Sequence, residues 1–204
     1  KENEKKEEEN KEENLKIINK IDKLQEDDTI TLDNFYNDLK ETVKSKGIEV
    51  NESNNDEYIL FDDAIENFEG VLNINPNNID AYFNLGSVLR LKGDLDQSKD
   101  MLKRAIALRN DHVDAYNMLG IVLLEKESLD EAILTFRKVL EIKSDHLEAK
   151  YNLGNVFLKK GSLDEALAAY VNVLKIKPDH LEARYNLGNV FLKKGSLDEA
   201  LVAY

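Results

Sequence analysis

The sequence predicts an all-α protein assembled from repeated helical units. Residues 148–170 and 182–204 carry nearly the same text, with differences at only two of 23 positions, and their starts lie 34 residues apart. Within each copy, apolar residues recur at the three- and four-residue spacing of a helix face. A short, fixed period places the core between neighbouring units, so we expect no single central core.

Residues 80–204 repeat three features at one phase of this period. A Leu-Gly pair recurs at Leu85-Gly86, Leu119-Gly120, Leu153-Gly154 and Leu187-Gly188. A small residue follows at Ser98, Ala132, Ala166 and Ala200. A large residue stands four positions later, at Leu102, Phe136, Tyr170 and Tyr204. Because glycine inside a helix costs about 1 kcal/mol relative to alanine, four glycines at one phase predict a close helix–helix contact. We expect the small residue on the opposite side of that contact.

This pattern resembles the tetratricopeptide repeat (TPR), a 34-residue unit of two helices. The resemblance implies a right-handed superhelical solenoid of antiparallel helix pairs. It divides the repeats into units at 80–113, 114–147, 148–181 and a truncated 182–204. Turn signals between the two helices of a unit occur at Gly93-Asp94, Gly161-Ser162 and Gly195-Ser196, with Glu127-Ser128 as the exception.

An acidic leader precedes the repeats. Residues 1–28 are expected to be mostly disordered, because the first 14 residues have no apolar side chain to bury, and a short amphipathic helix is expected at 15–24. The net charge of −13 divides into −4 for residues 1–28, −8 for residues 29–79 and −1 for residues 80–204. The repeats therefore lack the basic stripe that binds nucleic acid. No apolar run approaches the roughly 20 residues of a membrane span.

Residues 29–79 are expected to form a degenerate TPR-like helix pair with an inserted loop. Apolar spacing predicts helices at about 31–46 and 58–74, and residues 48–57, rich in Asn, Asp and Glu, are predicted to form the loop. Proline at Asn75-Pro76 ends the second helix.

The first helix of each unit has two faces. In the first full unit, the stripe expected to be buried holds Tyr82, Leu85, Gly86 and Leu89. The opposite side, which lines the concave groove in TPR families, holds Asp80, Phe83, Asn84, Ser87 and Arg90. Over the four units, the residues expected to bind a peptide are Phe83, Asn84, Asn117, Ile121, Tyr151, Asn152, Asn155, Tyr185, Asn186 and Asn189. A solvated face would be rich in Lys and Glu, whereas this face mixes Tyr, Asn and Leu, which favours a peptide groove. A second interpretation is packing on the adjacent repeat, notably for Leu124, Leu158 and Leu192.

Asparagines form a row along this face at Asn84, Asn152 and Asn186, interrupted by Met118. A side-chain amide offers a donor and an acceptor together, so such a row can hold an extended peptide by its backbone. The Asn-Leu-Gly-Asn-Val text resembles the TPR array of O-linked N-acetylglucosamine transferase, in which an asparagine ladder does this. The resemblance covers only the repeats.

Histidine is the one candidate for catalysis. His112, His146 and His180 each follow an Asp and lie 34 residues apart, which suggests either a general base or metal ligand, or structural punctuation at helix-end turns. Neighbouring helices lie about 10 Å apart, too far for these rings to share one metal. A helix C-terminus also favours a cation, so we expect a structural role, no metal and no cofactor. The chain has no cysteine.

These observations predict a non-catalytic, cytoplasmic interaction scaffold that binds a peptide segment of a partner protein in the groove. Two alternatives stay open. In the first, the chain is the substrate-recruiting TPR region of a larger, glycosyltransferase-like enzyme. In the second, the chain self-associates, either through the helix at 15–24 or through the open repeat end at Tyr204.

Overall fold

The structure is a computed structural model, and it describes residues 54–198 and 200. The leader at 1–28, the helix expected at 15–24 and the helix expected at 31–46 lie outside the described residues. The chain divides into two compact units, residues 1–67 and 68–204, and the packing discussed below is that of the second unit.

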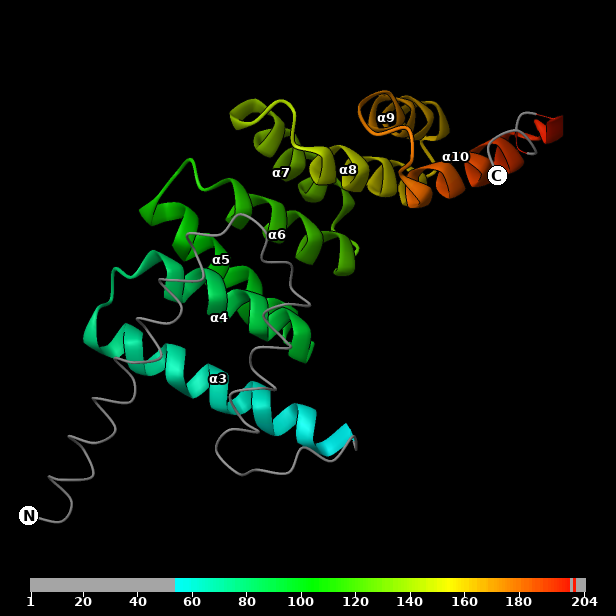
Figure 1. The fold of residues 1–204 in the computed structure, drawn as a ribbon. Coiled ribbons are helices and arrows are strands. Elements are labelled where there is room, and N and C mark those ends of the chain that lie inside the picture. The colour runs from blue at the N-terminus through cyan, green and yellow to red at the C-terminus, as the bar shows by residue number, and fades with distance from the viewer. Residues whose placement is uncertain (1–53, 199, 201–204) are drawn as a thin grey trace, which may run out of the picture. The chain divides into compact units, whose positions relative to one another are not determined.

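The described residues form eight helices and no strand (Figure 1). The helices are α3 (Asn54–Ile74), α4 (Ile79–Lys92), α5 (Leu95–Leu108), α6 (Val113–Glu125), α7 (Leu129–Ile142), α8 (Leu147–Lys160), α9 (Leu163–Ile176) and α10 (Leu181–Lys194). The all-α solenoid predicted from the sequence is confirmed. One boundary was wrong, because Asn54–Glu57, predicted as loop, belong to the first turn of α3. α3 ends at Ile74, directly before Asn75-Pro76, as predicted.

The helix pairs follow the 34-residue period. The first helices of the units, α4, α6, α8 and α10, begin at residues 79, 113, 147 and 181. Each helix from α4 to α9 packs on the next helix along the chain, and the first helices also contact one another, α4 with α6, α6 with α8 and α8 with α10. These four helices therefore form one continuous layer, which is the layer that carries the predicted groove residues (Figure 1).

In the three helix pairs that the structure describes in full, Gly86, Gly120 and Gly154 allow a close approach, as predicted, but their main neighbour differs from the expected one. A Cβ on Gly120 would lie 2.6 Å from Phe136 Cε1, and one on Gly154 would lie 2.7 Å from Tyr170 Cε1. The large residue, four positions after the small one, thus fills the space above the glycine. The small residue has a supporting role, shown by Ser98, whose buried hydroxyl donates to the Gly86 carbonyl at 2.6 Å.

The buried stripe of the first helices also differs from the predicted one. Tyr82 is only half-buried, and Ser87, expected on the groove side, is 7% exposed, with its hydroxyl donating to the Phe83 carbonyl. Two sets of small apolar residues missing from the predicted stripe are buried in every unit. They are Ala81, Ala115, Ala149 and Ala183, and Val88, Val122, Val156 and Val190. Their recurrence every 34 residues could have predicted this burial from the sequence, because a position that stays apolar in every repeat unit lies in the interface between units.

Most turns between the two helices use glycine for a backbone conformation that L-residues avoid. Gly93, Gly161 and Gly195 have φ values of 93°, 83° and 79°, and their N–H groups satisfy carbonyls in the last turn of the preceding helix, as in a left-handed C-cap. Glu127 occupies the same place in the second unit with φ 60°. Glu127-Ser128 therefore lacks the glycine of the other turns, as expected, but it keeps their backbone conformation.

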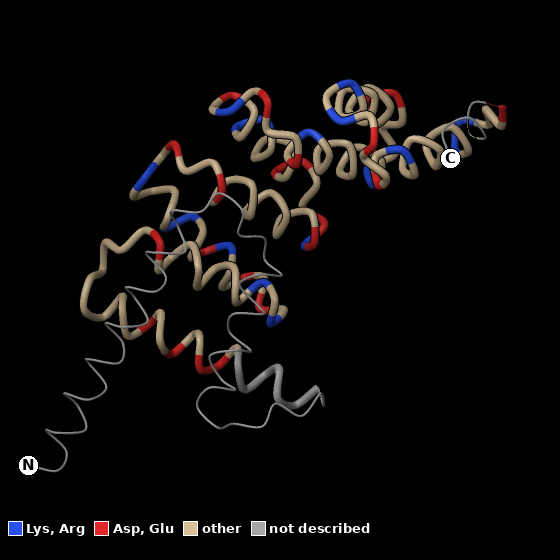
Figure 2. Tube along the Cα trace, in the orientation of Figure 1, with Lys and Arg blue, Asp and Glu red and all other residues tan. Residues whose placement is uncertain are grey.

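An ion pair joins successive units at one edge. The Lys126 ammonium lies 2.6 Å from the Asp96 carboxylate, and the same pairing recurs 34 and 68 residues later in Lys160–Asp130 and Lys194–Asp164. Lys126 holds the pKa of Asp96 below its usual value. The acids are largely exposed, so each pair adds little stability. The pairs neutralise charge along the array, where acidic and basic residues lie interspersed (Figure 2).

Replacing Gly154 by alanine should lower the free energy of unfolding by about 1–2 kcal/mol, because the overpacking against Tyr170 outweighs the gain in helix propensity. Gly70 is the matched control, since a Cβ there meets nothing within 4 Å, and Gly70→Ala should raise stability by up to about 1 kcal/mol. Urea unfolding followed by circular dichroism measures both. Equal stabilisation by the two variants would show that the close contact is not needed.

Candidate functional site

All ten predicted peptide-binding residues lie on the layer of first helices, two on α4, two on α6, three on α8 and three on α10. Their exposure differs widely. Tyr185 is 60% exposed, whereas Asn117 is only 7% exposed, and the remaining eight are half-buried. The face therefore combines accessible residues with residues held beneath the surface.

A hydrogen-bonded network occupies the step from α8 to α10. The Asn186 amide donates to the Tyr151 hydroxyl at 3.2 Å and to Asn155 Oδ1 at 3.0 Å. Asn155 Oδ1 also accepts the Tyr170 hydroxyl proton at 2.7 Å. Three helices are thereby joined, and Asn186 uses its donor for contacts between repeats. Burial raises the pKa of Tyr170, and the nearby Tyr151 adds to this shift, so Tyr170 stays a neutral donor.

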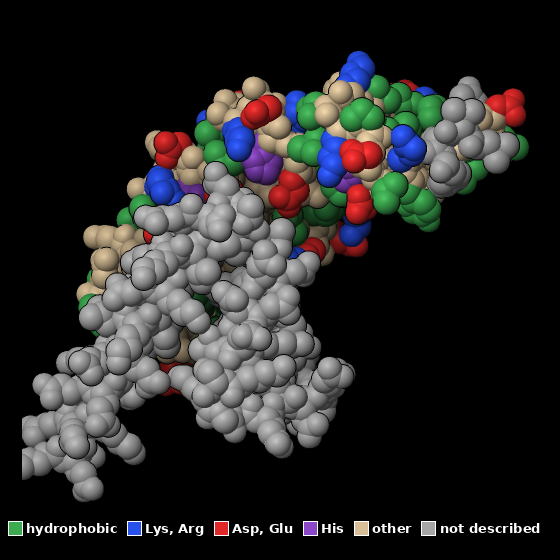
Figure 3. Space-filling view, in the orientation of Figure 1, with side chains coloured by type: hydrophobic (Ala, Val, Ile, Leu, Met, Phe, Trp, Pro, Cys, Tyr) green, Lys and Arg blue, Asp and Glu red, His purple; other side chains and the backbone are tan. Residues whose placement is uncertain are grey.

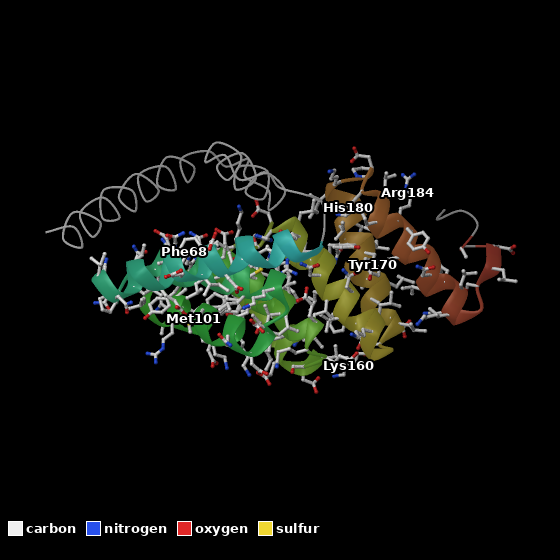
Figure 4. All side chains as sticks on the ribbon, turned by 90° about the horizontal axis from the view of Figure 1, so that it is seen from below. Phe68, Met101, Lys160, Tyr170, His180 and Arg184 are labelled. Carbon is white, nitrogen blue, oxygen red and sulfur yellow. The ribbon has the colours of Figure 1, made fainter. Side chains whose placement is uncertain are left out.

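Tyr170 is a network member that the sequence reasoning assigned only to the core. The signal that identifies it is a paired change between units. Tyr170 and Asn155 replace Phe136 and Ile121 of the preceding unit, so a hydroxyl and its acceptor enter together. Figure 4 shows Tyr170 midway along its helix pair, with His180 at one end and Lys160 at the other.

The step from α6 to α8 has the same architecture but lacks this network. Asn152 takes the place of Asn186, while Asn117 and Ile121 take those of Tyr151 and Asn155. Two buried atoms, Asn152 Nδ2 and Asn117 Oδ1, find no hydrogen-bond partner among the described residues. A buried polar group without a partner costs about 1–3 kcal/mol, so this step carries a cost that the next step avoids.

Two of the three leucines left open between binding and packing are found to pack. Leu124 packs against the buried cluster around Phe136, and Leu158 packs against the cluster around Tyr170. Leu192 is 45% exposed. In the space-filling view, hydrophobic side chains gather at the surface of the α9–α10 end of the array (Figure 3). Packing therefore accounts for the two inner leucines.

Two ion pairs connect the C-terminal ends of first helices. Arg90 lies 2.5 Å from Glu125, and Lys159 lies 3.0 Å from the Glu127 carboxylate. Each pair joins neighbouring units, so these charges support the repeat packing.

The histidines begin helices, which corrects the expectation that they lie near helix C-termini. His112, His146 and His180 are the N-cap residues of α6, α8 and α10. His146 Nδ1 accepts the Ala149 backbone N–H at 3.1 Å, a capping bond that needs an unprotonated nitrogen. Two of the three rings also contact an aromatic residue of the preceding unit. The His180 ring stacks on Tyr151 with centroids 5.0 Å apart, and the His112 ring lies 5.3 Å from Phe83.

Neither a metal centre nor a membrane span is found in the part of the chain that the structure describes. Within residues 54–198 and 200, no three His, Asp or Glu side chains come close enough to hold a metal ion. Over the same residues, no helix has the length and apolarity that crossing a bilayer demands.

Comparison with known proteins identifies the repeat. One model described as "TPR repeat" matches residues 61–93 and 154–195, and two described as "Tetratricopeptide repeat" match residues 81–145 and 123–170. The chain belongs to the tetratricopeptide-repeat family. Together the TPR models reach from residue 61 to residue 195, so they include part of α3. No curated protein matches the chain.

Solved TPR structures resemble the chain over most of its length. A crystal structure of MamA protein is 27% identical, covers 83% of this chain and 86% of its own, and superposes with a TM-score of 0.67. MamA from Desulfovibrio magneticus RS-1 is 17% identical, covers 83% and 89%, and has a TM-score of 0.69. YrrB, described as a TPR protein with an unusual peptide-binding site, is 24% identical, covers 81% and 88%, and has a TM-score of 0.61.

Asn186→Ala should destabilise the array more than Asn152→Ala, although both residues hold the same position in their repeats. The first change removes two hydrogen bonds between α8 and α10, worth about 0.5–1.5 kcal/mol each, whereas the second removes a group without a partner. The gain in helix propensity is the same for both and cancels. Thermal unfolding of the two variants compares them directly. Equal melting temperatures would mean that the network does not brace the repeats.

The buried imidazole of His112 should make stability depend on pH. Burial lowers the pKa of His112 below its usual 6.5, and the positive charge of Arg109 adds to this, while Asp114, Asp80 and Asp111 oppose it. The unfolded chain therefore binds a proton at a higher pH than the folded chain, and the free energy of unfolding should fall as pH drops through about 6.5. Urea titrations between pH 7.5 and 5.5 measure this slope.

His112→Gln removes this titration and should flatten the slope, whereas His146→Gln keeps His112 and serves as the control. A slope unchanged in His112→Gln would assign the pH dependence to other groups.

Proposed function

We propose that the chain is a non-catalytic interaction scaffold that binds a peptide segment of a partner protein along the layer of first helices. The observation that carries this proposal is the continuity of the layer. α4, α6, α8 and α10 contact one another in series, and between their contacts they present partly exposed aromatic and amide side chains. An extended segment that crosses several repeats would meet such groups at regular intervals.

The structural neighbours support a role in protein interaction, and we assign the peptide-binding site to the layer of first helices. TPR neighbours share the fold, and YrrB is described as having a peptide-binding site. Of the residues assigned to the groove, Asn186 and Asn155 already bond between repeats. Peptide contact therefore depends more on residues with accessible surface, above all Tyr185, which is 60% exposed.

A second candidate is self-association through α10. Leu181 is 72% exposed and Tyr185 is 60% exposed, whereas their counterparts one repeat earlier, Leu147 and Tyr151, pack against the cluster around Tyr170. A helix from a second copy would cover the same type of surface. Recruitment of substrates to a linked catalytic domain remains a variant of the first proposal, since it uses the same peptide contact.

Peptides selected from a random phage-displayed library on the immobilised chain should lose affinity in Tyr185→Glu. The change places a charge on the proposed binding layer, where desolvating it opposes binding. Leu134→Glu is the matched control, because Leu134 is 66% exposed but lies on the second helix α7. Fluorescence polarisation should show weaker binding, by about tenfold, only in the first variant.

Three outcomes would distinguish the candidates. Equal affinity of both variants would place the peptide elsewhere, and a library that yields no binder would contradict the peptide proposal. A dimer in light scattering that Tyr185→Glu converts to monomer would favour self-association.

A further inference from the structure

The His112 ring is buried, yet it lacks the hydrogen bond that its counterparts make. It is 7% exposed and begins α6 without a side-chain capping bond, whereas His146 and His180 each accept a backbone N–H of their own helix. His112 Nε2 is buried without a hydrogen-bond partner among the described residues. Packing therefore holds this ring in its place.

The aromatic partner of the His112 ring is Phe83 of α4, which is half-buried. The two ring centroids lie 5.3 Å apart, with the ring planes tilted by 37°. A neutral imidazole suits such an apolar contact. A protonated imidazole carries two N–H donors, and the donor at Nε2 would be buried with a positive charge and no acceptor. Protonation of the ring in this position is therefore costly.

The charged groups that act on His112 come from each element around it. They are Asp80 of α4, Arg109 at the end of α5, Asp111 of the connecting loop and Asp114 of α6. Asp111 and Asp114 are exposed, and Asp80 is half-buried and lies 3.9 Å from Arg109. A protonated ring that turned outward would move toward these three carboxylates and into water.

The balance between the inward and outward positions of the ring depends on pH. Burial lowers the pKa of His112 below its usual 6.5, and the positive charge of Arg109 adds to this, while the three carboxylates oppose it. As pH falls, a ring in water therefore binds its proton before the buried ring does. The ratio of outward to inward rings should rise by up to about tenfold for each pH unit between about 6.5 and the lowered pKa.

The His180 ring makes a similar aromatic contact but has a carboxylate beside it. It stacks on Tyr151 with centroids 5.0 Å apart, and its Nδ1 lies 3.0 Å from the Glu182 carboxylate. Protonation of His180 would create an ion pair there while the ring stays in place. Asp114 holds the position of Glu182 in the second unit, with a side chain shorter by one methylene group. We therefore expect His180, unlike His112, to accept a charge without moving.

We propose that His112 is a pH-sensitive cover over Phe83, which lies inward as a neutral ring and turns outward toward Asp80, Asp111 and Asp114 when it is protonated. The outward position uncovers Phe83 at the α4–α6 step. Phe83 is one of the residues predicted to bind a peptide, so a lower pH would enlarge the apolar surface offered to a peptide at this step. That consequence rests on the proposed function, whereas the cover itself does not.

The test measures solvent access to Phe83 in the full chain, by NMR of 13C-labelled aromatic rings between pH 7.5 and 5.0. Gadodiamide, a neutral and soluble gadolinium chelate, broadens the signals of rings that face solvent. Broadening of the Phe83 signals should rise as pH falls, and the nuclear Overhauser contact between Phe83 and His112 should weaken in parallel. Broadening of Phe83 that stays constant over this range overturns the proposal.

Tyr151 is the matched control within the same chain, because Glu182 allows His180 to be charged in place. Broadening of the Tyr151 signals should stay level while that of Phe83 rises. An equal rise at both rings would show a general loosening of the repeats and would overturn the proposal.

His112→Gln provides a second control, because glutamine cannot be protonated in this range. Broadening of Phe83 in this variant should not change with pH, and a rise as large as in the parent chain contradicts the cover. If the variant does not fold, the comparison of Phe83 with Tyr151 in the parent chain decides alone. Since no peptide is present, failure of the cover and failure of the peptide scaffold are observed separately.

Discussion

The close contact between a first-helix glycine and the large residue of its partner helix is the constraint on which the array depends. Gly86, Gly120 and Gly154 leave no room for a Cβ beneath Leu102, Phe136 and Tyr170. Because a protein interior is close-packed, this contact sets how near the two helices lie and hence which residues reach the next unit. The buried alanine and valine rows are the interface that results.

The same contact links packing to polar chemistry. The large residue above the glycine is Leu102 in the first full unit, Phe136 in the second and Tyr170 in the third. Only Tyr170 carries a hydroxyl, and that hydroxyl reaches Asn155. A change from phenyl to phenol therefore alters the polar groups of the layer of first helices while the core keeps its shape, and neighbouring units of one architecture acquire different surfaces.

Charge and histidine have supporting roles that follow from helix ends. The Lys–Asp pairs between units are exposed and modest in energy, but they repeat at one edge and keep the array nearly neutral. The histidines begin first helices. His146 and His180 cap their helices through a ring nitrogen, and the rings of His112 and His180 contact an aromatic residue of the unit before them. Their regular spacing reflects the repeat, because each histidine begins the first helix of its unit.

Periodicity alone determined the fold class, the repeat length, the presence of a close helix contact at the repeated glycines and the positions of the turns, because every unit repeats the same local pattern. The residue that meets each glycine was visible only in the structure. The sequence also placed the groove residues on one helix face. Only the tertiary structure decided which of them form hydrogen bonds to a neighbouring repeat. Asn152 and Asn186 hold the same place in nearly identical repeats. Asn186 nevertheless forms hydrogen bonds to the preceding repeat, whereas Asn152 Nδ2 has no partner among the described residues. The difference arises from residues 30 or more positions away in sequence, at Tyr151 and Asn155 for one and at Asn117 and Ile121 for the other. The hydrogen bonds between units depend on residues of other helices, so the residue pattern of one helix cannot predict them.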